Sequence, residues 1–268
     1  MKLGNVDLSV TINGDKMPFI WAHGLIGSMA LEDSSGMFDW DGCAGIVKCI
    51  RYDARGHGKS SGTLVPEDYN WPSLAQDMLG IADALGIDKF IAGGQSMGCA
   101  TSLYAALAAP QRITGLVLVN PPTAWESRAG QAAVYDLLAG VVEKDGIDAL
   151  CDLMRQTPAG PSFLQKAAPA ALEARLAGLK KMDAGVLAQV FRGARLCNFP
   201  PHEEFKKLTM PALILAWTGD GIHPVATAEE LHGLMPGSQL VVAKDVAGVI
   251  QWTGLIKEFI QGLCEHTK

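Results

Sequence analysis

Short apolar runs rich in β-branched residues alternate along this chain with longer segments of helical period. One such segment is 71–85, where Leu74, Met78, Ile81 and Leu85 recur on one helical face. The alternation is typical of βαβ units around a mainly parallel sheet. We therefore predict an α/β fold with a mainly parallel, doubly wound sheet. The predicted strands are 6–12, 17–22, 46–52, 89–92, 113–119, 213–217 and 239–243.

A long connection separates two of these strands, from Pro121 to about Pro201. It exceeds the length of an ordinary loop, and it contains helix-like stretches rather than low complexity. We predict a helical lid over the carboxyl edge of the sheet, with 1–120 and 206–268 as the core and 121–205 as the lid. The alternative is a second packing layer without a gating role. The predicted helices are 130–155, 170–182 and 184–197, interrupted at Pro158, Gly160 and Pro161.

The apolar residues of this insertion imply a largely apolar pocket beneath it. An alternative is that many of them pack the inserted helices on the core. These residues are Val134, Leu137, Leu138, Val141, Leu150, Met154, Phe163, Leu164, Val190 and Phe191.

Composition restricts the class of protein. The 268 residues are 49% hydrophobic and 19% charged, enough apolar material for one core that folds alone. The six cysteines are scattered without a C-x-x-C pair, which disfavours a secreted disulfide scaffold and a zinc site. Because there is neither a signal-like start nor an apolar run long enough to cross a bilayer, we expect a cytoplasmic protein without a membrane partner.

The net charge of -6 disfavours binding to nucleic acid. No stretch rich in lysine and arginine compensates for it locally. We expect a small-molecule substrate instead, and we predict neither a metal nor a cofactor.

A serine in a glycine-rich turn is the strongest candidate for chemistry. Residues 94–98 read Gly-Gln-Ser-Met-Gly and fit G-x-S-x-G, between the predicted strand 89–92 and a helical segment 97–109. The glycines permit a tight turn that exposes the hydroxyl of Ser96 as a nucleophile. The amide of Met97, at the start of the helix, then points toward a developing oxyanion.

Two other turns resemble segments of the α/β-hydrolase family. Residues 23–28 read His-Gly-Leu-Ile-Gly-Ser after a strand, and residues 53–60 fit D-x-R-G-x-G-x-S. The resemblance extends over nearly the whole chain. It implies that the Leu25 amide, after Gly24, supplies the second oxyanion donor and that His23 hydrogen-bonds the turn. The second segment is expected to stabilise the fold.

The resemblance also indicates the acid of a catalytic triad. Residues 216–224 read Ala-Trp-Thr-Gly-Asp-Gly-Ile-His-Pro and resemble the loop that carries this acid after the penultimate strand. Asp220 is the matching residue, and serine precedes acid in the chain as in the family. An aspartate at a strand end could instead cap the next helix.

The histidine that the family places after the last strand is missing. Residues 245–250 read Asp-Val-Ala-Gly-Val-Ile, so Val249 occupies its place. A serine hydroxyl needs an adjacent base near neutral pH. We expect slow reaction with a serine-directed phosphonate unless another base acts. We also expect Val249→His to raise esterase activity if the Gly248 turn projects it toward Ser96.

His223, three residues after Asp220, is the candidate for a relocated base. It could aim its imidazole at Ser96 from an unusual direction, or it could be an exposed or capping loop residue. Four other histidines are set aside because of their positions in turns, on an outer helix face or near the chain end. They are His57, His202, His232 and His266.

Three functional classes therefore remain open. The first is a hydrolase of an ester, lactone or activated C–C bond acting on a small apolar carbonyl substrate, with a non-standard base. The second is a lyase or isomerase that uses the same oxyanion donors, and the third is a binding protein that has lost catalysis. A chain altered at position 249 is a further possibility. The intact turn around Ser96 favours an enzyme, because a binding protein need not retain strain there.

Overall fold

A seven-stranded sheet forms the centre of the protein in a computed structural model that describes residues 1–265. The strand order is β3-β5-β4-β6-β7-β8-β9, in which β3 pairs antiparallel with β5 and every other pair is parallel. His266 lies outside the described residues. The sheet strands are β3 Val10–Asn13, β4 Pro18–Ala22, β5 Lys48–Tyr52, β6 Phe90–Gln95, β7 Ile113–Val119, β8 Ala212–Trp217 and β9 Ser238–Ala243.

Successive side chains of the strands belong in turn to two separate apolar cores. In β4, Ile20 and Ala22 belong to one core, whereas Phe19 and Trp21 belong to the other. This follows from the two-residue period of a strand, which sends successive side chains to opposite faces. A sheet that is buried on both faces needs a helical layer on each side.

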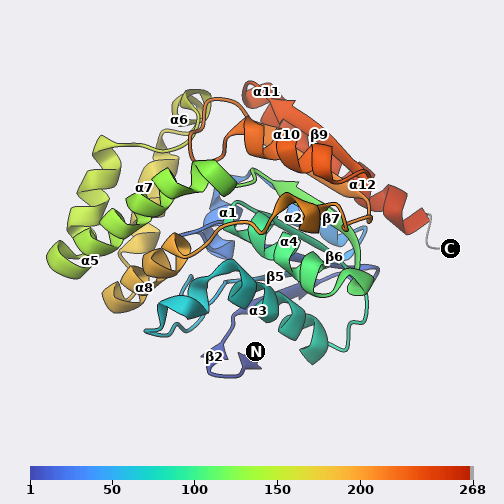
Figure 1. The fold of residues 1–268 in the computed structure, drawn as a ribbon, viewed down its shortest axis with the longest axis horizontal. Helices are drawn as coiled ribbons and strands as arrows, with labels where there is room; N and C mark the ends of the chain where they lie inside the picture. The colour runs from blue at the N-terminus through green and yellow to red at the C-terminus, as the bar shows by residue number, and fades with distance from the viewer. Residues whose placement is uncertain (266–268) are drawn as a thin grey trace.

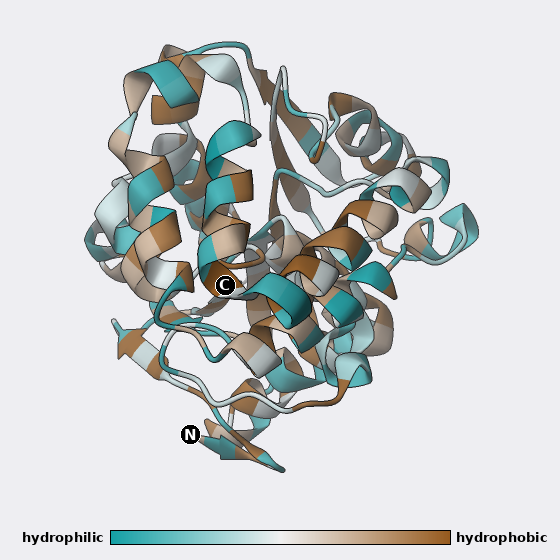
Figure 2. Ribbon diagram, turned by 90° about the vertical axis from the view of Figure 1, so that its left-hand side faces the viewer, coloured by the Kyte–Doolittle hydropathy of each residue, from teal (hydrophilic) through white to brown (hydrophobic). Residues whose placement is uncertain are grey.

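Helices cover both faces of the sheet, as the predicted doubly wound α/β class requires. On one face pack α3 Trp71–Ala84, α4 Met97–Ala108 and α10 Val225–Leu234. On the other face pack α2 Trp40–Ala44 and α12 Trp252–Glu265. In Figure 2 the strands are largely brown, and many helices carry both brown and teal residues, consistent with one buried and one exposed face.

Four of the helices between β7 and β8, α5 to α8, lie together on one side of the molecule, at the left in Figure 1. We call them the inserted helices. Part of their surface forms a third apolar core of its own, which also contacts Leu25 and Ile26 of the core domain. The inserted helices are α5 Arg128–Gln156, α6 Ser162–Ala167, α7 Ala170–Leu179 and α8 Ala184–Arg195.

Shorter elements complete the chain. They are β1 Lys2–Leu3, β2 Val6–Asp7, α1 Met29–Ser35, α9 His202–Phe205, α11 Val246–Ile250 and the 3-10 helices η1 Pro66–Tyr69, η2 Pro110–Arg112 and η3 Trp125–Ser127. Among residues 1–265, no helix combines the length and apolar character needed to cross a membrane.

Two of the departures from the predicted elements have a clear local cause. The predicted strand 6–12 is split, because the Ser9 amide bonds the Ser60 hydroxyl and its carbonyl accepts from Asp53 instead of continuing one ladder. The first inserted helix is interrupted at Gly146, whose φ of 84° and ψ of 179° are not helical. Glycine tolerates this conformation because it has no β-carbon.

Candidate active site

Ser96 lies at the junction between β6 and α4, where the sequence predicts it. Its φ of 55° and ψ of -109° are unusual for a residue with a side chain. Glycines make this turn possible: a β-carbon on Gly94 would collide with the backbone of Gly98, and one on Gly98 would collide with the Ala22 carbonyl. The Ser96 amide donates to the Val119 carbonyl at 2.9 Å, which fixes the turn to the next strand.

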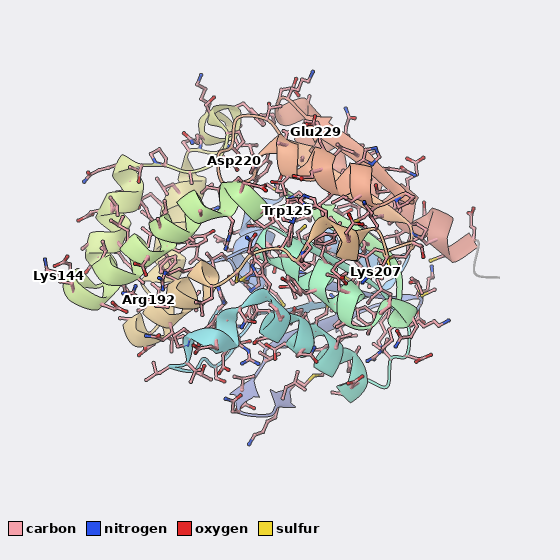
Figure 3. All side chains as sticks on the ribbon, in the orientation of Figure 1. Trp125, Lys144, Arg192, Lys207, Asp220 and Glu229 are labelled. Atoms are coloured by element: carbon pink, nitrogen blue, oxygen red, sulfur yellow. The ribbon has the colours of Figure 1, made fainter. Side chains whose placement is uncertain are left out.

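His223 connects Ser96 to Asp220. Its Nε2 lies 2.8 Å from the Ser96 Oγ, and its Nδ1 lies 2.7 Å from the Asp220 Oδ2. A carboxylate only accepts, so Nδ1 carries the proton and Nε2 is left to accept from the serine hydroxyl. Both His223 and Asp220 belong to the loop between β8 and α10. Figure 3 shows Asp220 between α10 and the inserted helices.

Asp220 is held as a carboxylate by the groups around it. Its Oδ2 also accepts from the Trp217 indole at 2.8 Å, and its Oδ1 accepts from the Ile222 amide at 2.9 Å. Burial alone would raise the pKa of this carboxyl. Its hydrogen bonds to His223, Trp217 and Ile222 outweigh burial and lower the pKa to about 2. Asp220 is therefore ionised at neutral pH and keeps the imidazole oriented.

The two predicted oxyanion donors lie beside Ser96. Leu25 and Met97 line the same cavity as the serine, and a β-carbon on Gly24 would lie 3.5 Å from the Ser96 Cβ. Within residues 1–265, neither the Leu25 nor the Met97 amide donates a hydrogen bond to the chain. Two uncommitted amides next to a nucleophile have the chemistry of an oxyanion site.

His23 supports the turn, as the sequence predicts. Its Nε2 accepts from the Ala54 amide at 3.0 Å, so its Nδ1 carries the proton and donates to the Gly24 carbonyl at 2.7 Å. Burial lowers the pKa of His23 to about 4, with the charge of Arg51 acting in the same direction and the Gly24 bond opposing them. The ring is therefore neutral, and both its nitrogens are engaged with the backbone.

The other histidines lie away from Ser96 or are bonded elsewhere. His57 is buried in its turn with Nδ1 at 2.9 Å from the Arg55 carbonyl, and burial lowers its pKa to about 3. His202 bonds Glu230, and His232 bonds the Ser238 hydroxyl. Among the five histidines within residues 1–265, only His223 hydrogen-bonds Ser96.

Asp53 organises the second family-like turn. Its Oδ1 accepts from the Met29 amide at 2.8 Å and its Oδ2 from the Lys59 amide at 2.9 Å, while its carbonyl accepts from the Ser60 hydroxyl. Arg55 in the same turn forms a two-point ion pair with Asp77, with both contacts at 2.6 Å. The predicted fold-stabilising role of this turn agrees with these bonds.

Val249 is buried in α11 and packs in the apolar core that contains Trp217 and Trp252. It does not line the cavity beside Ser96. Residues 246–250 form a short helix capped by the Asp245 side chain, and the condition set for Val249→His, that the Gly248 turn projects residue 249 toward Ser96, has no support in this packing.

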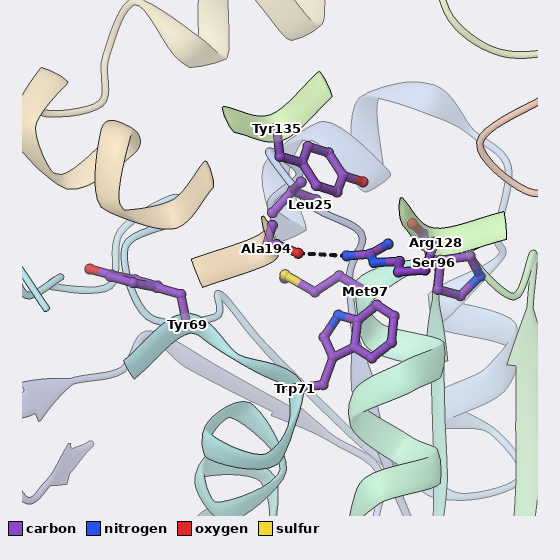
Figure 4. Close-up of a pocket in the computed structure, with 9 residues that line it drawn as sticks. Leu25, Tyr69, Trp71, Ser96, Met97, Arg128, Tyr135 and Ala194 are labelled. Atoms are coloured by element: carbon purple, nitrogen blue, oxygen red, sulfur yellow. Dashed lines mark hydrogen bonds between the residues drawn. The ribbon is translucent and has the colours of Figure 1, made fainter. Parts of the chain in front are cut away.

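A small cavity separates Ser96 from the inserted helices (Figure 4). It measures about 10 Å³, room for roughly one water molecule. Its walls come from both the core and the inserted helices. The lining residues are Leu25, Tyr69, Trp71, Ser96, Met97, Pro122, Arg128, Tyr135 and Ala194.

The apolar residues from which a pocket was inferred do not line this cavity. Leu150 and Phe191 are buried in the core of the inserted helices, whereas Val134 and Leu137 are 44% and 58% exposed. The alternative role, packing of the inserted helices, therefore applies to the buried ones. Hydropathy identified apolar helix faces, but not the surface that each face covers.

Two arginines near the site were missed by the sequence reasoning. Arg128 is buried and lines the cavity. Arg175 in α7 retains exposed surface, yet desolvation lowers its pKa, and the charge of Asp220 acts in the opposite direction. Neither arginine stands in a sequence pattern that would distinguish a residue near a pocket from one in solvent.

Comparisons with known proteins identify the family of this chain. The family model described as "alpha/beta hydrolase fold" matches residues 18–255. The chain is 30% identical over 201 residues to the protein named "Putative carbamate hydrolase RutD" of Agrobacterium fabrum, covering 72% of each chain.

Two solved structures share the fold. The enol-lactonase of Burkholderia xenovorans LB400 has a TM-score of 0.78 at 22% identity, covering 98% of this chain and 96% of its own. A thermophilic esterase of Thermogutta terrifontis has a TM-score of 0.78 at 21% identity, covering 96% and 94%. With its nucleophile turn, its sheet order and the match over most of its length, the chain belongs to the alpha/beta hydrolase fold family.

Proposed function

We propose that the protein is a serine hydrolase of esters or lactones, with Ser96 as nucleophile, His223 as base and Asp220 as acid. The observation that carries the proposal is the unbroken hydrogen-bond chain from the serine hydroxyl through the imidazole to the carboxylate. Acid and base lie three residues apart on one loop, so they are positioned as a unit. This arrangement supplies the base that Val249 cannot.

In the first half of the reaction, the Ser96 Oγ attacks the substrate carbonyl carbon while its proton moves to the His223 Nε2. The carbonyl oxygen becomes an oxyanion, which the Leu25 and Met97 amides stabilise. The imidazolium is stabilised by Asp220, which stays ionised. Collapse of the intermediate breaks the bond to the leaving alkoxide, which takes the proton from Nε2 and leaves an acyl ester on Ser96.

In the second half, a water molecule attacks the acyl carbonyl and gives its proton to His223. The second tetrahedral intermediate breaks the bond to the Ser96 Oγ, which recovers that proton. The carboxylic acid product then leaves. No redox partner is needed, and for a lactone both products remain one molecule.

The relatives support this reaction class. Their names describe a carbamate hydrolase, an enol-lactonase and an esterase, all of which cleave a bond at a carbonyl carbon. Within the class, the geometry favours hydrolysis over the lyase, isomerase and binding alternatives, because a base aligned on Ser96 serves nucleophilic attack directly.

We further propose that the inserted helices act as a lid. Residues of α5 and α8 line the cavity beside Ser96, and its space of about 10 Å³ is too small for an ester. Substrate entry then requires these helices to move away from the core.

Labelling with a fluorophosphonate tests the proposed base. We expect rapid, stoichiometric labelling at Ser96, contrary to the slow reaction expected when residue 249 is considered alone. Ser96→Ala should abolish it, and His223→Ala should slow it about 100- to 10,000-fold, the usual contribution of a general base. His232→Ala, which alters an exposed histidine, is the matched control. Labelling that is unaffected by His223→Ala, or absent from the unmutated protein, would refute the proposal.

A further inference from the structure

The cavity beside Ser96 contains a buried cation without an acidic partner. Arg128 is 3% exposed and lines the cavity together with the serine (Figure 4). Its hydrogen bonds go to the Cys197 carbonyl at 2.8 Å, the Ala194 carbonyl at 2.6 Å and, weakly, the Thr123 hydroxyl at 3.4 Å. No aspartate or glutamate among residues 1–265 forms a salt bridge with it.

Part of this arrangement is structural. The two carbonyl contacts connect the start of α5 to the chain that leaves α8, so Arg128 ties the entry of the inserted segment to its exit. The guanidinium also lies 4.5 Å from the Trp71 ring centre and 5.2 Å from that of Tyr135. Carbonyl dipoles and aromatic faces stabilise a cation, but they do not neutralise its charge. A buried charge without a counter-ion is costly.

Two neighbouring groups add to the environment of Arg128. Tyr135 lines the same cavity, and burial raises the pKa of its phenol against the opposing effects of Arg128 and Gln131, so the phenol is neutral at neutral pH. The Arg175 side chain forms no side-chain hydrogen bond or ion pair within residues 1–265, and it interacts electrostatically with Asp220. The surroundings of Ser96 therefore attract an anion more strongly than an apolar pocket would.

We propose that the substrate carries a carboxylate, bound by Arg128, a few bonds away from the carbonyl that Ser96 attacks. A guanidinium without a counter-ion matches one negative charge, and its Nη1, which donates only weakly to Thr123 at 3.4 Å, remains available to a carboxylate oxygen. Because Arg128 and Ser96 line the same small cavity, the carboxylate and the reacting carbonyl must be close together, as in the monoester or lactone of a short dicarboxylic or keto acid. The inference rests on the proposed function, because that function identifies the carbonyl that reacts with Ser96. It replaces the wholly apolar substrate expected from the sequence.

Binding of two matched ligands tests this proposal without turnover. Monomethyl succinate has one ester and one carboxylate, whereas dimethyl succinate has the same skeleton without charge. Both are titrated calorimetrically at neutral pH into Ser96→Ala protein, which cannot hydrolyse them by the proposed route. We expect the anionic ester to bind about 10- to 100-fold more tightly, the range typical of a hydrogen-bonded charge pair.

Three further variants locate the effect, each made in the Ser96→Ala protein. Arg128→Gln should remove the preference, while Arg192→Gln, which deletes a surface arginine paired with Asp136 and Glu143, should retain it. Arg175→Gln should reduce the preference less than Arg128→Gln, because Arg175 does not line the cavity. Circular dichroism establishes which variants are folded, and Arg128→Lys replaces Arg128→Gln if the latter unfolds. Lysine keeps the positive charge but lacks the planar guanidinium, so Arg128→Lys should weaken the preference for the anionic ester.

The outcomes separate this inference from the proposed function. Equal binding of the two esters overturns the carboxylate proposal, whatever the fate of the Arg128 variants. A preference that survives Arg128→Gln but disappears in Arg175→Gln overturns the assignment to Arg128. If the proposed function is wrong but the carboxylate proposal is right, the result differs. The protein then still binds the anionic ester more tightly, but Ser96→Ala does not change the hydrolysis of either ester.

Discussion

At the scale of single residues, the proposed mechanism depends on one imidazole held between a carboxylate and a serine hydroxyl. His223 receives its orientation from Asp220, whose other contacts to Trp217 and Ile222 hold the carboxylate in place. A neutral amide at position 220 would preserve the shape of this group. It would no longer favour the tautomer in which Nε2 is free to accept a proton.

Asp220→Asn therefore separates the shape of the acid from its charge. We expect kcat on an activated ester to fall by about 10,000-fold, with a smaller change in KM, because only the proton path is impaired. The measurement is steady-state hydrolysis of a p-nitrophenyl ester. Asp183→Asn, which replaces the cap of α8 by another good capping residue, is the control. Full activity in Asp220→Asn would remove the acid from the mechanism.

The lowered pKa of Asp220 also predicts a pH effect on stability. The pKa of Asp220 is lowered to about 2 in the folded state, so the folded protein binds fewer protons than the unfolded chain between about pH 4 and pH 2. The stabilisation is present above that window and is lost as pH falls through it. Urea unfolding between pH 5 and pH 2 should show a steeper loss in the unmutated protein than in Asp220→Asn.

The two buried histidines predict that the free energy of unfolding already falls with pH above the range in which Asp220 titrates. Burial lowers the pKa of His23 to about 4 and that of His57 to about 3, whereas both titrate near 6.5 in an unfolded chain. Below pH 6.5 the unfolded chain therefore gains protons that the folded protein does not. Each histidine should lower the free energy of unfolding by up to about 1.4 kcal/mol per pH unit as pH falls toward these values.

Denaturant unfolding from pH 7 to pH 4 measures this slope. His23→Gln should flatten it, whereas His232→Gln, at an exposed histidine, should leave it unchanged. An unmutated protein whose stability is constant between pH 6.5 and pH 4 would contradict the assignment of neutral, buried rings.

At the scale of elements, strand and turn patterns were predicted better than helix orientation. The six strands β4 to β9 were located because buried parallel strands are continuous apolar runs. Residues 94–98 were identified because the close backbone contacts at Gly94 and Gly98 exclude side chains, so glycine is needed at both positions. The proximity of His223 to Ser96 remained open, since loop conformation determines where an imidazole points. Arg128 was missed because its environment is created by chain segments 66 residues and more away in sequence.

The short helix α11 makes Val249 a test at this scale. Val249→His should not raise esterase activity, because residue 249 packs in the apolar core and Asp220 is already bonded to His223. Burying an imidazole without a partner should cost about 1–3 kcal/mol of stability. Thermal unfolding and p-nitrophenyl ester hydrolysis measure the two effects.

Ile250→His is the matched control, because Ile250 is 73% exposed and adjacent in the same helix. It should change neither stability nor activity appreciably. A large gain in activity from Val249→His would mean that residue 249 reaches Ser96, contrary to its place in the structure.

At the scale of the whole molecule, the inserted helices and the core form the site jointly. Ser96, Leu25 and Met97 line the cavity from the core, whereas Arg128, Tyr135 and Ala194 line it from the inserted helices. The contacts of Arg128 hold the entry and the exit of the inserted segment together near this wall. Movement of the inserted helices would therefore alter access and anion binding at the same time.

If the inserted helices act as the proposed lid, their opening should limit reaction with fluorophosphonates. If the inserted helices must move before any reagent enters, the labelling rate should saturate with concentration at a value shared by ethyl and octyl reagents. That limiting rate should fall when solvent viscosity is raised, as expected for a motion of helices through solvent. Stopped-flow measurement of labelling gives both quantities. In Asp220→Asn, chemistry becomes slower than opening, so the plateau should drop, lose its dependence on viscosity and differ between the two reagents. Plateaus that differ with chain length in the unmutated protein, or rates that stay proportional to concentration, would show that Ser96 is reached without movement of the inserted helices.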